Sequence, residues 1–302
     1  MDGIINVYKE KGFTSHDVVA VVRKIVNQKK VGHTGTLDPE AEGVLPICLG
    51  KATKLADYIM AESKTYSAEV IFGATTTTQD HTGEIVENRP FEFDKEKIKQ
   101  AVSKFKGEIL QVPPMYSAIK VNGKKLYEIA RAGGKVERKA RKIYINNIQI
   151  DEFIPPDMIK ITVECSKGTY IRTLCHDIGE ELGWGAYMSG LLRSRSGGFT
   201  LDTAVKLEKL KELCGNGRIS EVILPMEEAL KGYKKISVTK KADKFIHNGC
   251  KIYEYFFDRT DGKVEIGDIV AAYDSENNLV GLFTAVFDDE KNMVCIKPLK
   301  IL

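Results

Sequence analysis

The sequence has no long apolar run and no paired cysteine motif. No stretch approaches the roughly eighteen apolar residues that cross a bilayer, and the first residues, MDGIINVYKEKG, contain no apolar core of signal-peptide length. The six cysteines form no CxxC pair and show no Cys/His ligand spacing, which argues against a zinc site. We therefore expect a protein of the reducing cytoplasm, with neither a disulfide framework nor a membrane partner.

The chain also has little excess charge of either sign, since its 302 residues carry a net charge of only +3. The distribution of that charge is uneven. Residues 115–144 contain nine Lys or Arg and two Glu, a net charge of +7, which leaves −4 for the rest of the chain. A basic segment on a slightly acidic protein is typical of a polyanion-binding protein, although a solvated charged face has the same composition.

The length predicts about two domains, and 43% hydrophobic residues are enough for a sizeable core. Up to residue 231 the apolar spacing predicts a mixture of strands and helices. Strands are expected at the start of segments 3–15, 143–154 and 158–174 and throughout 65–73. Helices are expected in 15–28, 51–60, 91–109 and from Gly168 to Leu182. From Ile236 onward, short alternating stretches are separated by turn sequences such as HNGC and DSENN. This pattern predicts a small β domain, with the boundary near residue 232.

The segment VGHTGTLDPEAEGVLPICLG, residues 31–50, is the most unusual part of the sequence. Its glycines and prolines make it too broken for a helix or a long strand. Asp38 precedes Pro39, so its backbone is biased away from the helical region, and the glycines on either side allow tight bends. The segment is therefore expected to present the Asp38 side chain from a tight turn.

Three kinds of chemistry are compatible with such a turn at first sight. Phosphate binding by a P-loop is excluded, because Gly43 and Gly50 are seven residues apart and Ala52 stands where the motif needs Ser or Thr. A second hypothesis pairs Asp38 with Glu40 or Glu42 as two catalytic carboxylates, as in glycosidases, but residues so close on one loop seldom face each other.

The third hypothesis is a single carboxylate nucleophile that a cation keeps ionised. Arg172 is the candidate cation, because it lies in the otherwise apolar segment KGTYIRTLCHDIG, at the expected end of a strand. An arginine on an apolar face usually needs a buried acidic partner. A guanidinium that reaches past the apolar surface to solvent remains the alternative.

Several stretches together resemble the bacterial TruB-type family of tRNA pseudouridine synthases. They are YKEKGFTSHDVV, GHTGTLDPEAEGVLPICLGKATK, KTYSAEVIFGATTTTQDHTGEIV, QVPPMYSAIKVNGKKLYEIARAG and GTYIRTLCHDIGEELGWGAYMSGLLRSRSGGF. The resemblance runs in order through residues 1–231, and the segment after it looks, more loosely, like the family's PUA-type RNA-binding domain. Two departures are visible: Lys9-Glu10 replaces the family's Lys-Pro, and Thr76-Thr77-Thr78 replaces its Thr-Asp-Thr.

The resemblance implies a role for individual residues. Asp38 would be the nucleophile, Arg172 its ionic partner, and Tyr66 a residue that lies against the target base and takes part in proton transfer. The implied substrate contacts are His33, Tyr170, Leu191, Lys9, Lys54 and Lys64. The implied RNA clamp lies in an insertion at about 108–144 and consists of Lys124, Lys125, Arg131, Arg138 and Arg141.

The implied fold is α+β, with a mixed, largely antiparallel central sheet flanked by helices, the basic insertion, and a PUA-like β domain at 232–302. The implied activity is isomerisation of uridine 55 in the T arm of tRNA to pseudouridine by a monomer, without cofactor, metal or guide RNA. Attack of Asp38 on C6 of the base, attack on C1′ of the sugar and assistance to a glycal all remain open. The alternative function is a tRNA-binding or tRNA-folding protein whose turnover is dispensable.

Overall fold

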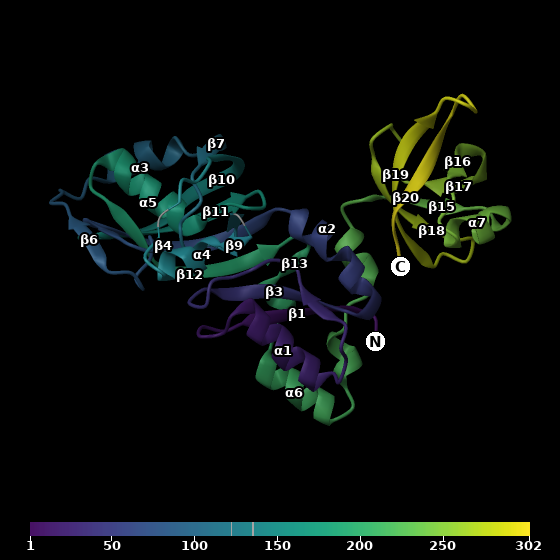
Figure 1. The fold of residues 1–302 in the computed structure, drawn as a ribbon, viewed down its shortest axis with the longest axis horizontal. Coiled ribbons are helices and arrows are strands. Elements are labelled where there is room, and N and C mark those ends of the chain that lie inside the picture. The colour runs from purple at the N-terminus through teal and green to yellow at the C-terminus, as the bar shows by residue number, and fades with distance from the viewer. Residues whose placement is uncertain (122, 135) are drawn as a thin grey trace.

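The computed structural model describes residues 1–121, 123–134 and 136–302. These residues form a ten-stranded sheet, a six-stranded sheet and two small two-stranded sheets, and Figure 1 shows the two large sheets apart from each other, each with its helices. The first sheet takes its strands from the chain up to Lys206, and the second takes its strands from Lys234 onward. No helix in the described residues is long and apolar enough to cross a membrane. The domain boundary at residue 232 stays a prediction. The first sheet is formed entirely by residues before it, and the second sheet entirely by residues after it.

The first sheet has the order β14-β1-β3-β12-β4-β11-β10-β7, with β2 paired to β3 and β13 to β12. Its strands are β1 (Gly3–Lys9), β2 (Val31–His33), β3 (Glu42–Leu49), β4 (Lys64–Phe72), β7 (Gly107–Gln111), β10 (Arg141–Ile154), β11 (Met158–Cys165), β12 (Ala186–Ser196), β13 (Phe199–Thr200) and β14 (Val205–Lys206). Within the described residues, the pairs β1–β14 and β3–β12 of this sheet are parallel and its other pairs are antiparallel. The mixed, largely antiparallel sheet is thus confirmed.

Two pairs of helices cover different halves of this sheet (Figure 1). Helices α1 (Ser15–Ile25) and α6 (Leu207–Gly215) pack on β1 and β3, and α3 (Lys95–Ser103) and α5 (Ile171–Leu182) pack on β4, β10 and β11. The capping box formed by Thr14 and Asp17 begins α1 where the sequence predicts it. The helix expected in 91–109 ends at Ser103, because residues 107–111 form β7 instead.

Residues 42–49 form an eight-residue strand, so the expectation that 31–50 contains no long strand is wrong. Both faces of β3 are covered: Leu45 and Ile47 pack under α1, while Val44 and Cys48 pack against a second core on the opposite side. A strand that is buried on both faces has a continuous apolar sequence rather than an alternating one. That is why VLPICL does not show the period of two that predicts a strand.

Strand β12 is the element that joins the two halves of the sheet. It pairs with β4 over most of its length, but its parallel contact with β3 consists of two residue pairs, Leu192 with Glu42 and Arg193 with Gly43. We call this short contact the seam. Apolar spacing predicts no strand here, because most β12 residues are only half-buried and the sequence alternates poorly.

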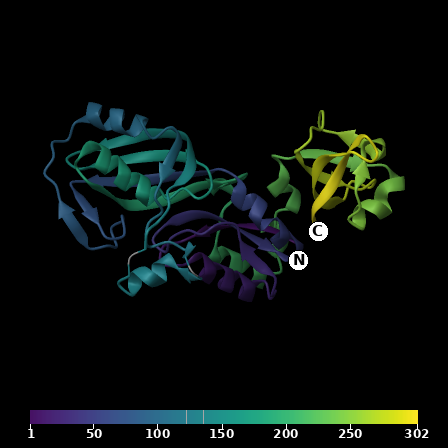
Figure 2. The same cartoon turned by 45° about the horizontal axis from the view of Figure 1, so that its top comes forward.

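The second sheet has the order β16-β20-β19-β18-β15-β17 and forms a curled β unit with its own apolar core. Its elements are β15 (Lys234–Val238), α7 (Asp243–His247), β16 (Ile252–Tyr253), β17 (Phe257–Thr260), β18 (Ile269–Tyr273), β19 (Leu279–Asp288) and β20 (Met293–Ile301). Figure 2 shows this unit beside α2 and the N-terminus. Tyr273 and Leu282 share a core with Leu55 and Ile59, so the two parts are packed together.

The remaining elements are short. They are α2 (Ala56–Ala61), β5 (Ala74–Thr76), β6 (Ile85–Asn88), β8 (Lys120–Val121), β9 (Lys124–Lys125), α4 (Leu126–Arg131) and the 3-10 helices Gly50–Leu55, Leu201–Thr203, Ile219–Val222, Met226–Leu230, Lys240–Ala242 and Glu254–Phe256. The helix expected in 51–60 is thus one 3-10 segment followed by α2. Strands β8 and β9 and helix α4 belong to the basic segment, which contacts α5 through the backbone carbonyl of Tyr116.

Candidate active site

The loop between β2 and β3 contains Asp38, and hydrogen bonds from a buried lysine hold this loop in place. The Lys9 side chain is inaccessible to solvent, and its Nζ donates to the carbonyls of Pro39, at 3.0 Å, and Ala41, at 2.5 Å. The backbone N–H of Leu37 donates to Ser15 Oγ at 2.9 Å. Burial lowers the pKa of Lys9 to about 8, so the ammonium is still charged at neutral pH. The loop is therefore held on both sides of Asp38.

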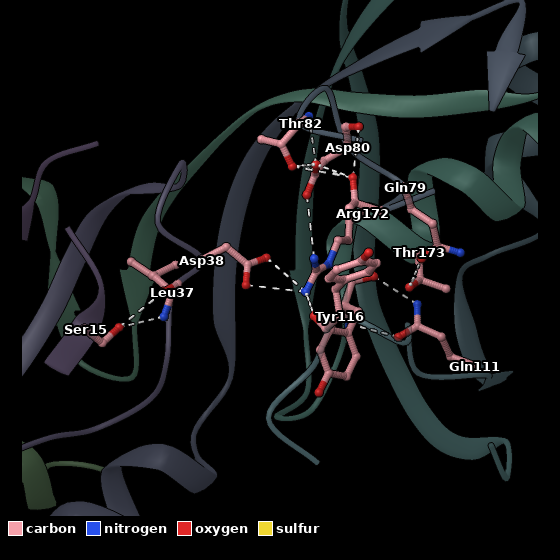
Figure 3. A network of polar contacts seen from close by, with 12 residues as sticks. Ser15, Leu37, Asp38, Gln79, Asp80, Thr82, Gln111, Tyr116, Arg172 and Thr173 are labelled. Carbon is pink, nitrogen blue, oxygen red and sulfur yellow. Dashed lines mark hydrogen bonds and ion pairs between the residues drawn. The ribbon is translucent and has the colours of Figure 1, made fainter. Parts of the chain in front are cut away.

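Arg172 reaches Asp38 from the other half of the sheet (Figure 3). It occupies the first turn of α5, so its expected place at the end of a strand is wrong. Its Nη2 lies 3.3 Å from Oδ2 and 3.4 Å from Oδ1 of Asp38, and the side chain is only 6% exposed. The guanidinium is buried against acids and does not reach out to solvent, which removes that alternative.

The same guanidinium has two further partners that sequence reasoning missed. Nη1 lies 3.6 Å from Oδ2 of Asp80, and Nη2 donates to the backbone carbonyl of Tyr116 at 2.6 Å (Figure 3). Asp80 Oδ1 accepts hydrogen bonds from the hydroxyls of Thr78 and Thr82. Arg172 thus faces two carboxylates, one of which is already fixed by threonines. The only sequence signal for Asp80 is an acid within the motif TTTTQDHTG, which is equally typical of a turn.

Burial and charge act in opposite directions on Asp38. Removal of the carboxylate from water raises its pKa, and the nearby Asp80 charge raises it further, while the Arg172 guanidinium lowers it. Burial also raises the pKa of Tyr66, a β4 residue that faces Arg193 of β12. The Tyr66 phenol therefore stays protonated at neutral pH. The arrangement offers a half-buried carboxylate beside a buried cation and a buried neutral hydroxyl.

The glycosidase-like pair finds no support in the geometry. Glu40 points to His81, with 3.9 Å between Oε2 and Nε2, and Glu42 lies near Tyr8 and Lys11. The second carboxylate close to Asp38 is instead Asp80, which shares the same arginine rather than facing Asp38 across an open gap. The single-carboxylate hypothesis fits the geometry better.

Two of the expected substrate contacts lie beside this centre. Tyr170 is the residue before α5, where its backbone is bound to the Gln111 amide and its ring lies 6.0 Å from the Arg172 guanidinium. Leu191 of β12 lines a small cavity together with Asp38. The full lining is Asp38, Glu40, Ala41, Asp80, His81, Met188, Ser189, Gly190 and Leu191.

Other expected contacts lie elsewhere or face the protein. His33 accepts a hydrogen bond from the Gly35 N–H and packs edge-to-face on His16 at 5.0 Å, and burial lowers its pKa to about 4. Lys64 donates to the carbonyls of Met60 and Glu62, and Lys54 donates to the carbonyl of Ile301 in the second sheet. Their roles as substrate contacts stay predictions.

The expected clamp residues are not equivalent. Lys124 and Lys125 lie on β9, Arg131 ends α4, and Arg141 begins β10. Arg138 is turned inward, since its Nη1 donates to the Pro113 carbonyl at 3.0 Å. It therefore ties the two ends of the insertion together more directly than it offers a charge to a ligand. In the described residues there is no group of three or more His, Cys, Asp or Glu arranged to hold a metal ion.

Comparison with known proteins gives a consistent result. The model of the "TruB family pseudouridylate synthase (N terminal domain)" matches residues 23–171, and that of the "tRNA pseudouridylate synthase B C-terminal domain" matches 172–231. Proteins named tRNA pseudouridine synthase B from Staphylococcus saprophyticus and Alkaliphilus oremlandii are each 47% identical to this chain. The first alignment covers 99% of both chains, and the second covers 100% of this chain and 99% of the relative.

Solved structures support the same assignment. A chain of a Cbf5–Nop10–Gar1 complex superimposes with a TM-score of 0.79 at 30% identity, over 99% of this chain and 84% of that one. A chain of an H/ACA ribonucleoprotein bound to a substrate RNA gives a TM-score of 0.78 at 28% identity, with the same coverage. The chain has the pseudouridine synthase fold and belongs to the TruB family of pseudouridylate synthases.

Proposed function

We propose that this protein isomerises uridine 55 in the T arm of tRNA to pseudouridine, with Asp38 as the nucleophile. The observation that carries the proposal is the ion pair between Asp38 and Arg172, formed by segments from opposite sides of the seam. The names of the relatives support tRNA as the substrate. A buried carboxylate needs such a partner to stay ionised, because burial alone raises its pKa.

The reaction breaks the N1–C1′ bond of the nucleotide and forms a C5–C1′ bond to the same uracil. C5 then loses its proton and N1 gains one, so the product is an isomer of the substrate. Nothing is oxidised and no group is added. Asp38 would form the transient covalent bond or assist departure of the base, and the open choice between C6 and C1′ remains. Burial raises the pKa of Tyr66, so its phenol enters the reaction protonated. It can take part in the proton transfer to or from the uracil once the C5–C1′ bond has formed.

The substrate base has to leave its stack to reach Asp38. Unstacking costs a few kcal/mol and least in a loop, where enzymes that act on RNA bases usually find their targets. The basic insertion would clamp the phosphates of the arm through Lys124, Lys125, Arg131 and Arg141. We further propose that the protein works as a monomer in the cytoplasm, without a guide RNA, and that the second sheet is a PUA-like RNA-binding unit.

Tritium release from tRNA labelled at C5 of uridine tests the proposal. Wild-type protein should release tritium, whereas Asp38→Asn should release none and still bind the tRNA within a few-fold of wild-type affinity, because the two side chains are nearly isosteric. Glu42→Gln is the matched control, since it neutralises a carboxylate four residues away that points away from Arg172. Turnover by Asp38→Asn would refute the nucleophile assignment.

The alternative function predicts a different result from the same samples. A tRNA-binding or tRNA-folding protein with dispensable turnover would bind labelled tRNA normally and release no tritium, whichever residue occupies position 38. Its biological readout would be rescue by Asp38→Asn in cells that lack the wild-type protein. The ion pair between Asp38 and Arg172 disfavours this alternative. A protein that only binds RNA gains nothing from an acid that is kept ionised by a buried arginine.

A further inference from the structure

The cavity beside Asp38 contains one basic side chain with no part in the isomerisation steps above. Among the described residues that line it, Asp38, Glu40 and Asp80 carry carboxylates, and His81 is the only one with a basic side chain. The His81 side chain is 42% exposed, so it lies at the mouth of the cavity rather than in its interior. This histidine has the position of a ligand-binding group.

The backbone of His81 is firmly placed. Its N–H donates to the Met188 carbonyl of β12 at 2.9 Å, and the preceding Asp80 bridges to Met188 and pairs with Arg172. The side chain is held much more weakly. Its Nε2 lies 3.9 Å from Oε2 of Glu40, which is too long for a hydrogen bond, and Glu40 is itself 47% exposed. Such an exposed pair contributes little, so His81 can exchange Glu40 for a better anion.

Other cations near the site are already engaged. The ammonium groups of Lys9 and Lys64 are buried on backbone carbonyls, and Arg172 is shared by two carboxylates and Tyr116. Asp38 and Asp80 are both paired with Arg172, so Glu40 is the exposed acid that an approaching polyanion meets at the rim of the cavity. Without a compensating cation, the Glu40 charge repels a phosphodiester.

A uridine whose base lies against Asp38 brings its own sugar–phosphate backbone close to the residues around Asp38, and His81 is one of them. We propose that His81 binds a backbone phosphate of the target nucleotide and releases Glu40 in doing so. The inference rests on the proposed function, because it takes the ligand to be RNA. The cavity itself is too small for a uracil, so the base and the phosphate would both bind at its rim, the base at Asp38 and the phosphate at His81.

Steady-state kinetics on a labelled T-arm stem-loop give the first test. His81→Ala should raise KM about fivefold and leave kcat within twofold, which is the loss expected for one exposed charged contact. His81→Arg should restore KM, and Glu40→Gln should lower it about twofold, because a competing anion is gone. Lys99→Ala is the control for net charge, since Lys99 pairs with Glu96 on α3 and does not line the cavity.

A neutral methylphosphonate in place of each phosphate flanking the target uridine gives the decisive test. The affinities are measured with Asp38→Asn protein, so the result does not depend on turnover. One of the two linkages should weaken binding about fivefold when His81 is present and have no effect in the His81→Ala background. Equal losses in both backgrounds at both linkages would overturn the inference, and so would an unchanged KM for His81→Ala with wild-type turnover. Absence of tritium release by wild type would instead refute the proposed function.

Discussion

The residue at the centre of the site is an arginine with three acceptors. Arg172 faces Asp38, Asp80 and the carbonyl of Tyr116 from a position that is almost fully buried. Because Asp80 is fixed by two threonine hydroxyls, it can hold the guanidinium plane in place while Asp38 reacts. The ionic partner of the nucleophile is thus oriented by a second acid that does not itself need to touch the substrate.

The pKa of Asp38 has a consequence for stability. Burial raises the folded-state pKa above its unfolded value of 3.8, so the ionised carboxylate destabilises the fold at neutral pH. We expect Asp38→Asn to unfold at a slightly higher temperature than wild type at pH 7, because the Asp38 side chain is only half-buried and water screens part of the effect. The difference should shrink as the pH falls through the folded-state pKa and vanish below about 3.8. Thermal unfolding at a series of pH values measures it, and a lower melting temperature for Asp38→Asn at pH 7 would contradict the raised pKa.

The sequence indicated the two charged residues at the centre of the candidate site far better than it indicated their surroundings. Asp38 stood out locally, because a proline and several glycines shape its turn. The apolar segment around Arg172 made it a candidate partner, 134 positions along the chain, but left solvent exposure as an alternative, and only the resemblance to a family favoured the pairing with Asp38. Asp80 was missed because its position depends on a bridge to Met188 on a strand that the sequence did not predict.

At the scale of elements, the two strands that form the seam were missed for two different reasons. Strand β3 is covered on both faces and lacks alternation, while β12 is half-buried and carries polar residues beside the cavity. Strand β4, which buries one face only, alternates regularly and was predicted correctly. Periodicity therefore identified a strand with one buried face, although it carries Tyr66, and failed for the two strands of the seam.

Gly43 is the residue that the seam depends on most directly. Its φ is +107°, and a Cβ there would overlap the carbonyl oxygen of Arg193 on β12. Gly43→Ala should therefore lower the free energy of unfolding by roughly 3 kcal/mol or more, through backbone strain and loss of the parallel contact.

Gly12→Ala provides the matched control for this substitution. Gly12 also has a positive φ, +82°, but no atom lies within 4 Å of the point that a Cβ would occupy. Gly12→Ala should therefore lower the free energy of unfolding only through backbone strain, by about 1–2 kcal/mol. Urea denaturation of both variants makes the comparison. Equal costs at the two glycines would mean that contact with Arg193 contributes nothing to the seam.

At the scale of the whole molecule, the site is assembled from two halves of one sheet. Asp38 comes from the β1–β3 half, while Arg172 and Tyr66 come from the half that contains β4 and α5. The two halves are joined in the sheet by β12 through only two residue pairs. A change at the seam should therefore alter the distance between Asp38 and Arg172 more than it alters the structure within either half.

The charge distribution over the whole molecule predicts how binding depends on salt. Lys124, Lys125 and Arg141 lie on the basic insertion, and each phosphate they neutralise adds roughly 0.7–0.9 to the log–log slope of affinity against salt. Replacing all three with Glu should weaken tRNA binding and reduce the slope by roughly 2. Filter binding between low and moderate salt measures both quantities.

Arg138 allows the electrostatic effect to be separated from loss of structure. Because its guanidinium holds the Pro113 carbonyl, Arg138→Gln should reduce activity more than it changes the salt slope. If the triple substitution leaves the slope unchanged, the insertion does not hold phosphates.

The contact between Tyr116 and Arg172 also bears on which uridines the enzyme ignores. In the resting protein the shorter hydrogen bond of Nη2 goes to the Tyr116 carbonyl, at 2.6 Å, and the longer contact goes to Asp38. A mononucleotide brings no arm of phosphates with which to draw the basic insertion away from the arginine. Free uridine and its phosphates should therefore meet an Asp38 whose partner Arg172 is still bound to the Tyr116 carbonyl, and we expect them to be poor substrates compared with an RNA arm.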